Sequence, residues 1–257
     1  MKRAPLIRRS RFPRHPIYLF CCGATWAISA CTVVTNDTGA DAATAGIGGS
    51  SATAATDAAV SSDGASDVGD GGPPVTPPGS GFDNNDDGWT VVGDAQTQTS
   101  KPDYNGMGGN PDGLISAKDD VAGGTWYFQA PAKYLGDQSQ GYGKYLEFDL
   151  KTTDVSNPFD DYDVVLVGAG KVLALDTAMN PTTTSWTSYR IALTETSGWK
   201  KIATESTPWS TDFASLPAPS QEEFKAILAD VTRLRIRGEF NTGPDTGFLD
   251  NVAFGAN

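Results

Sequence analysis

The chain of 257 residues has 31 acidic and 19 basic residues, which give a formal net charge of −12 and disfavour a nucleic-acid partner, because an acidic surface repels a polyanion. The only histidine, His15, and two of the three cysteines lie within the first 22 residues. The rest of the chain therefore lacks the groups for Ser-His-Asp or Cys-His catalysis and for zinc, copper or haem sites, which leaves carboxylates and hard cations such as calcium.

The first 30 residues have the pattern of a bacterial lipoprotein signal peptide. Six basic residues and no acidic one precede His15, and the apolar stretch at 16–30 is shorter than the roughly 20 residues that span a bilayer. The stretch ends in Ile28-Ser29-Ala30-Cys31, which resembles a lipobox, so we predict that Cys31 is lipidated. An ordinary secretory signal peptide that leaves a free thiol is the alternative. With a lipid on Cys31, the protein is predicted to belong to the bacterial cell envelope, at the outer membrane or cell surface. The lipid would be its only contact with the membrane.

Residues 31–81 are predicted to be a disordered tether that follows the lipid anchor. Beyond Cys31 they consist mostly of Ala, Gly, Ser, Thr, Asp and Pro and contain no aromatic residue, so they cannot bury enough apolar surface to fold. A flexible coil of this length extends roughly 35–45 Å on average. Beyond residue 30 the chain keeps 13 basic and all 31 acidic residues, so its formal charge there is −18.

The composition changes at Phe82, and residues 82–257 are predicted to form one domain. Alternating polar and apolar residues predict half-buried strands at 144–151, 188–193 and 233–237. Two apolar runs on either side of Gly168-Ala169-Gly170 predict a hairpin, and residues 250–254 predict a short closing strand.

One helix is predicted shortly before the strand at 233–237. Ser220 is placed to cap it and Glu223 to complete a capping box, and four apolar residues share one face: Phe224, Ile227, Leu228 and Val231. Many short strands, Gly-rich turns and a single helix predict an all-β fold, an antiparallel jelly-roll β-sandwich with one short helix.

Two stretches far apart in the chain resemble the laminin IV type A domain, also called laminin B. The first includes Trp126-Tyr127-Phe128-Gln129-Ala130-Pro131 and Lys133-Tyr134-Leu135-Gly136-Asp137, which is similar to the family pattern W-Y-x-x-A-P-x-K-[FY]-L-G-D. The second runs from Leu234-Arg235-Ile236-Arg237 to Asp250-Asn251-Val252, which is similar to the L-R-I-R strand and the D-N-V close of the family. The resemblance covers about residues 82–257. It implies a galactose-binding-like jelly roll and no catalysis. The cysteine-rich modules that surround this domain in animals are missing, so matrix partners are not carried over.

An acidic segment at the start of the domain is a candidate calcium site. Residues 83–88 match D-x-[DN]-x-[DN]-G, which makes Asp83, Asn85 and Asp87 oxygen donors and puts Asp94 at the twelfth position. A second arrangement joins Asp83 or Asp87 to Asp250, because jelly-roll modules often hold a calcium ion between the first and last strands. The alternative is a solvated acidic loop, since Asp and Asn favour turns.

Several aromatic residues in the first half of the domain are candidates for a sugar-binding face, because sugar rings stack on aromatic faces while neighbouring amides and carboxylates bond their hydroxyls. The candidates are Tyr104, Trp126, Tyr127, Tyr134 and Tyr142. Alternation along Trp126-Tyr127-Phe128 must send one side into the core, so a structural role for Trp126 is the alternative.

These features predict a monomeric, surface-displayed binding module that has no catalytic residue, with a glycan or surface polymer as its ligand. A structural or adhesive module that contacts another protein is the second hypothesis. A carboxylate-based glycosidase is the third, and its acids would come from the pairs Asp119-Asp120, Asp160-Asp161 and Glu222-Glu223.

Overall fold

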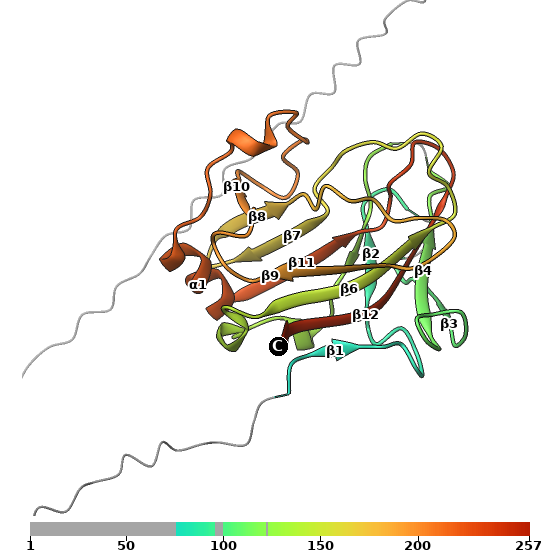
Figure 1. Ribbon diagram of the computed structural model, residues 1–257, viewed down its shortest axis with the longest axis horizontal. Helices are drawn as coiled ribbons and strands as arrows, with labels where there is room; N and C mark the ends of the chain where they lie inside the picture. The colour runs from blue at the N-terminus through green and yellow to red at the C-terminus, as the bar shows by residue number, and fades with distance from the viewer. Residues whose placement is uncertain (1–75, 96–99, 122) are drawn as a thin grey trace, which may run out of the picture. The chain divides into compact units, whose positions relative to one another are not determined.

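The computed structural model describes residues 76–95, 100–121 and 123–257, which form two antiparallel sheets, one α-helix and three short 3₁₀ helices (Figure 1). The predicted signal peptide, Cys31 and most of the predicted tether lie outside these residues. None of the described helices has the length and apolar character needed to cross a bilayer.

The first sheet is built around the long C-terminal strand β12. Its strands follow one another in the order β3 (Asp103–Asn105), β4 (Leu114–Lys118), β12 (Thr246–Ala256), β6 (Tyr145–Thr152) and β9 (Thr187–Ala192). The short strand β1 (Gly79–Ser80) also pairs with β12, so the first sheet includes residues that precede Phe82, the predicted boundary. The hydroxyl of Ser80 explains this extension, because it accepts hydrogen bonds from Trp89 Nε1 (3.0 Å) and Tyr134 OH (2.8 Å) inside the domain.

The second sheet lies against the first and holds the predicted hairpin. Its strands follow one another in the order β10 (Lys200–Ile202), β8 (Lys171–Leu175), β7 (Val164–Gly168), β11 (Val231–Arg237), β5 (Tyr127–Gln129) and β2 (Thr90–Val92). Ala169 and Gly170, both with positive φ, turn the chain between β7 and β8.

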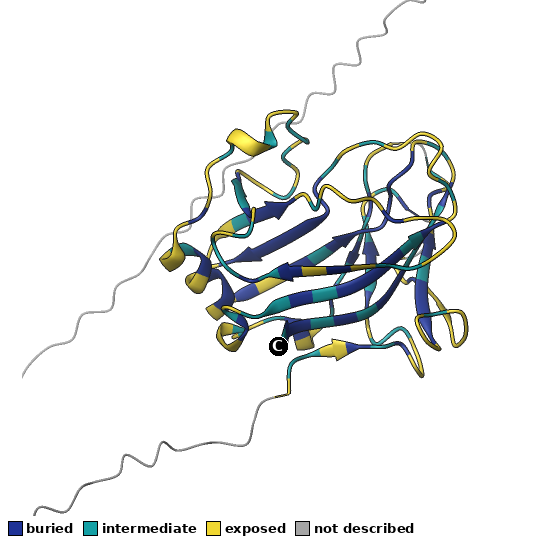
Figure 2. Cartoon of the chain, viewed as in Figure 1, coloured by how far each residue is buried: buried dark blue, intermediate teal, exposed yellow. Residues whose placement is uncertain are grey.

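The main core fills the space between the two sheets, and its largest members are the fully buried Trp89, Trp126 and Trp199. Strand β7 is buried along its whole length, as its unbroken dark blue shows (Figure 2). Its second face is covered because Val165 and Val167 pack in a smaller outer cluster. The stacked rings of Trp209 and Phe213 cover that cluster, which explains a continuous apolar run in place of alternation.

Helix α1 (Gln221–Ala229) begins as predicted. Ser220 Oγ accepts from the Glu223 N–H at 3.1 Å, and Glu223 Oε2 accepts from the Ser220 N–H at 2.9 Å, so the capping box is present. The helix backbone approaches the end of β7 so closely that a Cβ at Gly168 would lie 2.5 Å from the Ile227 carbonyl oxygen. The short 3₁₀ helices are η1 (Ala132–Tyr134), η2 (Ser139–Gly141) and η3 (Phe213–Ser215). The predicted all-β jelly-roll sandwich with one short helix is confirmed.

Candidate functional site

The first predicted calcium arrangement, which joins the donors of residues 83–88 to Asp94, does not assemble as its spacing suggested. Asn85 Oδ1 accepts from the Asp87 N–H at 2.6 Å, and the Asp87 carboxylate accepts from Ser80 Oγ at 2.7 Å and pairs with Lys133. Asp94 lies elsewhere and accepts from the Gly124 N–H at 2.6 Å, because β2 carries the chain away from the loop. Within residues 76–95, 100–121 and 123–257, no group of three or more His, Cys, Asp or Glu side chains is arranged to hold a metal ion.

The second predicted arrangement is closer to the structure, because Asp83 and Asp250 lie near enough to interact electrostatically. Asp250 on β12 is fully buried and stands opposite Asp149 on β6. Its carboxylate accepts from the N–H groups of Asn110 (2.5 Å) and Asn251 (2.7 Å). Burial, together with the charges of Asp149 and Asp83, raises the pKa of Asp250 to about 6.

The predicted aromatic cluster does not form one surface. Trp126 and Tyr134 are completely buried, so neither offers a face for stacking on a sugar, and the structural alternative for Trp126 is the one observed. Trp126 packs edge to face on Phe128, and Tyr134 donates to Ser80 and to the Val252 carbonyl.

The other three predicted aromatics lie in separate places. Tyr104 on the edge strand β3 is 38% exposed and donates to the Asp83 carbonyl. Tyr127 on β5 packs against the outer cluster, and Tyr142 lies against α1 and donates to Glu195. These three tyrosines therefore contact three different parts of the fold and do not form one binding surface.

A cavity of about 620 Å³ lies where three loops meet at one end of the sandwich. The loops connect β4 to β5, β6 to β7, and β11 to β12, all at the end where β11 finishes and β12 begins (Figure 1). The lining residues are Asp119, Asp120, Val121, Gly123, Gly124, Thr125, Phe159, Glu239, Thr242, Gly243 and Pro244.

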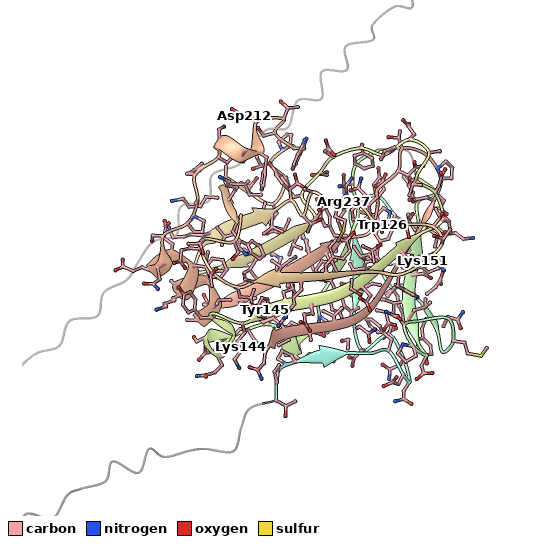
Figure 3. All side chains as sticks on the ribbon, in the orientation of Figure 1. Trp126, Lys144, Tyr145, Lys151, Asp212 and Arg237 are labelled. Carbon is pink, nitrogen blue, oxygen red and sulfur yellow. The ribbon has the colours of Figure 1, made fainter. Side chains whose placement is uncertain are left out.

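Arg237, at the end of β11, ties two of these loops together. Its side chain is 1% exposed, forms an ion pair with Asp163 (3.2 Å) and donates to the carbonyls of Phe159 (2.7 Å) and Glu239 (2.5 Å). Figure 3 shows Arg237 beside Trp126, whose carbonyl accepts from the Gly238 N–H at 3.1 Å. The guanidinium also lies 4.5 Å from the centre of the Phe159 ring, so it fixes this aromatic wall of the cavity.

Two buried carboxyl groups, Asp119 and Glu239, line the cavity, and a third, Asp245, is buried close enough to interact with Glu239. Burial, together with the charges of Asp119 and Asp245, raises the pKa of Glu239 to about 8. Burial also raises the pKa of Asp119, and it raises the pKa of Asp245 to about 6 although the Thr152 hydroxyl donates to Asp245 at 3.0 Å. Asp119 and Glu239 are close enough to share a hydrogen bond, which requires a proton on one of them.

Two oxygen atoms of this group lack a donor. Glu239 Oε2 and Asp245 Oδ1 are buried and have no hydrogen-bond partner in the part of the chain that the structure describes. Buried polar groups are usually paired, so these unpaired oxygens are places where a water molecule or a ligand can supply the missing donor. Carboxyl oxygens accept from hydroxyl and ammonium groups, which defines the chemistry that the cavity offers.

The same geometry does not suit glycoside hydrolysis. That reaction needs two carboxyl groups about 5 Å or more apart across the scissile bond, whereas Asp119 and Glu239 are close enough to share a hydrogen bond. In the predicted pair Asp119-Asp120 only Asp119 is buried, and Glu223 of the helix pair is engaged by its capping box and by Lys201.

Sequence reasoning missed Glu239, Asp245 and Phe159 as site residues. Each follows or precedes a predicted strand in a loop, where a single acidic or aromatic residue gives no pattern. One available signal was Arg237, which ends the alternating run of β11 and is buried, so it must find carboxyl or carbonyl partners.

Comparison with known proteins identifies the family. The laminin B (domain IV) pattern matches residues 127–256. Laminin subunit gamma-2 of Equus caballus is 33% identical over 129 residues, which are 49% of this chain and 10% of that protein. A laminin-like protein, lam-2, of Caenorhabditis elegans is 30% identical over 136 residues, which are 50% of this chain and 7% of that protein.

Two solved structures are similar to parts of this chain at low sequence identity. The L4b domain of human laminin alpha-2 has a TM-score of 0.46 and 16% identity, over 55% of this chain and 78% of that one. A family 30 carbohydrate-binding module of a Clostridium thermocellum cellulase has a TM-score of 0.41 and 14% identity, over 71% and 95%. The chain thus spans about a tenth or less of the laminin relatives described above. The predicted resemblance is confirmed, and this chain belongs to the laminin B (domain IV) family.

Proposed function

We propose that this domain is a non-catalytic carbohydrate-binding module, displayed on a bacterial cell surface through a lipid on Cys31. The cavity at the loop end is the observation that carries the proposal. Its volume of about 620 Å³ lies in the range of roughly 300–1,000 Å³ typical of small-ligand sites.

The lining of the cavity combines the two kinds of group that bind sugars. Phe159, Val121 and Pro244 supply apolar surface, against which the carbon–hydrogen faces of a sugar ring pack. Asp119, Asp120 and Glu239 supply acceptors for hydroxyl groups. The acidic charge of the chain is compatible with neutral and basic glycans and opposes binding of nucleic acid.

The test is glycan binding by the full chain and by a variant whose cavity is filled. Gly124 suits this purpose because a Cβ there meets no atom within 4 Å and its φ is not positive. We expect Gly124→Phe to lower glycan affinity at least tenfold, and Gly124→Ala, a matched control with a small side chain, to keep it. Equal binding by both variants would place the glycan elsewhere and contradict the assignment of this cavity.

The alternative of an adhesive module that contacts another protein predicts a different outcome. A neutral, basic and acidic glycan panel would then show no binding, while a protein partner would bind Gly124→Phe and the unchanged chain equally. Because this outcome depends on no group in the cavity, it is distinct from a weak glycan interaction.

A further inference from the structure

The cavity at the loop end is lined by acidic side chains and by no basic one. Asp119, Asp120 and Glu239 line it, and none of its described lining residues is a lysine or an arginine. The charge of Arg237 acts on Glu239, but its guanidinium is already engaged by Asp163 and by backbone carbonyls. The floor of the cavity therefore has more negative than positive charge whenever its carboxyl groups ionise.

Glu239 is a buried acid of the cavity lining whose side chain lacks a hydrogen-bond donor at one oxygen within the described part of the chain. This residue is 8% exposed and lines the cavity, and its Oε2 atom has no hydrogen-bond partner among the described residues. Its other interactions within the protein include one with the backbone N–H of Trp126. A buried carboxylate without sufficient donors is unfavourable, and a ligand that supplies a donor relieves this.

Without a ligand, a proton takes that role. Asp119 and Asp245 face Glu239 with negative charge and Arg237 faces it with positive charge, while Asp94 and Asp120 act on Asp119. This balance favours a proton on Glu239 at neutral pH, because burial and its acidic neighbours raise its pKa to about 8. An ammonium group carries the same charge as that proton and has three donors instead of one.

We propose that the cavity selects sugars that bear a free, protonated amine, and that the ammonium group donates to Glu239 and Asp119. This inference rests on the proposed carbohydrate-binding function and names its ligand class. Neutral hydroxyl groups also donate to carboxylates, but they do not offset the charge of two neighbouring acids. Uronic and sulfated sugars are repelled by the same acids.

The first experiment compares two ligands that differ in the amine alone. Calorimetric titration of the full chain at pH 6 uses a glucosamine hexamer and the N-acetylglucosamine hexamer of the same linkage. We expect the glucosamine hexamer to bind at least tenfold more tightly. Repeating the titration in buffers of different ionisation enthalpy should show that this ligand, unlike its acetylated counterpart, releases a proton from the protein.

The second experiment changes one charge on the protein. Glu239→Gln keeps the size of the side chain and removes its charge, and we expect the two hexamers to bind this variant within twofold of each other. Glu222→Gln is the matched control, because Glu222 is exposed in the first turn of α1, which packs on the opposite end of β7 from the cavity. It should keep the tenfold preference. Proton release by the unchanged protein is measured independently, so the proposal remains testable even if Glu239→Gln folds poorly.

Three outcomes would overturn the inference. Equal or tighter binding of the acetylated hexamer would reject amine selection and leave the proposed carbohydrate-binding function intact. Competition by oligolysine at the concentration where the glucosamine hexamer competes would assign the cavity to protein amines. Binding of neither hexamer would reject the inference, and a glycan panel without any ligand sensitive to Gly124→Phe would reject the proposed function as well.

Discussion

The two ends of the sandwich shift the pKa values of their carboxyl groups in opposite directions. At the helix end, the Ser220 N–H, followed by Lys201 and Lys171, lowers the pKa of Glu223 to about 2. At the loop end, burial and acidic neighbours raise the pKa of Glu239 to about 8. An acid in the first turn of a helix stabilises the fold, whereas buried acids that repel one another cost stability. The difference indicates that the helix end is built for folding and that the loop end keeps groups whose advantage lies in binding.

The largest expected effect comes from removing the cation of the loop end. Arg237→Met leaves Asp163 as a buried charge without its partner, and we expect the free energy of unfolding at pH 7 to fall by about 3–5 kcal/mol. Arg233→Met, which breaks a more exposed ion pair with Glu205, should cost less than about 1 kcal/mol. Urea unfolding of the two variants measures the difference. Equal losses would mean that Arg237 does not hold the loops together.

A third group of acidic residues lies around Asp83 and Asp250, away from both ends compared above. Calcium binding by this group remains a prediction. If an ion binds there, calcium at about 100 times its Kd should stabilise the full chain by about 2.7 kcal/mol relative to chelator. Asp250→Asn should remove this gain, while Asp212→Asn, a change at an exposed loop residue, should preserve it. Identical unfolding curves with calcium and with chelator would leave residues 83–88 as an ordinary acidic turn.

The pH dependence of stability should separate the two ends next. An acid whose pKa is raised on folding favours the folded state most at low pH, and this advantage is lost as pH rises through its folded pKa. Stability should therefore decline from about pH 5 to pH 8 as Asp245, Asp250 and finally Glu239 ionise. Glu239→Gln should flatten the upper part of this decline and stabilise the fold at pH 8 by about 1–3 kcal/mol. Chemical unfolding at several pH values tests this, and an unchanged slope in the variant would contradict it.

The smallest expected effect lies at the helix end. Ser220→Ala removes the hydroxyl of the capping box and should cost about 1 kcal/mol at pH 7. Because the pKa of Glu223 is lowered on folding, its own contribution is present above about pH 4.5 and is lost as pH falls towards 2. Acid titration of the unfolding free energy should show this loss in the unchanged chain and not in Glu223→Gln. A loss of equal size in both would place it in other carboxyl groups.

Local patterns were sufficient to predict most of the fold. The capping box at Ser220 and Glu223 involves residues three apart, and the turn at Ala169 and Gly170 joins neighbouring strands. These features depend on interactions between residues that are close in the sequence, so a local pattern is sufficient to predict them. The pairing of Gly79 and Ser80 with β12 was missed because it depends on Trp89 and Tyr134, which come from two other segments.

The candidate site was harder to predict because its parts meet only after folding. Asp119 and Glu239 are 120 residues apart in the chain, and no local pattern indicates that their loops meet. The exposed Asp83 and Asn85, by contrast, have the spacing of calcium ligands. The local hydrogen bonds of a turn are sufficient to explain that spacing. Trp126 illustrates the same limit, since composition cannot tell a stacking platform from a core residue.

Strand β1 also determines where a mechanical force would enter this domain. A pull on the chain before Thr76 reaches Pro78 and β1 first, which are held to β12 by the Phe254 N–H and by two paired residues. When β1 detaches from β12, the force would next act on the hydrogen bonds of the Ser80 hydroxyl with Trp89, Tyr134 and Asp87. Under tension the domain would thus lengthen at its edge before the two sheets separate, and the loop-end cavity, which β1 does not line, would keep its shape.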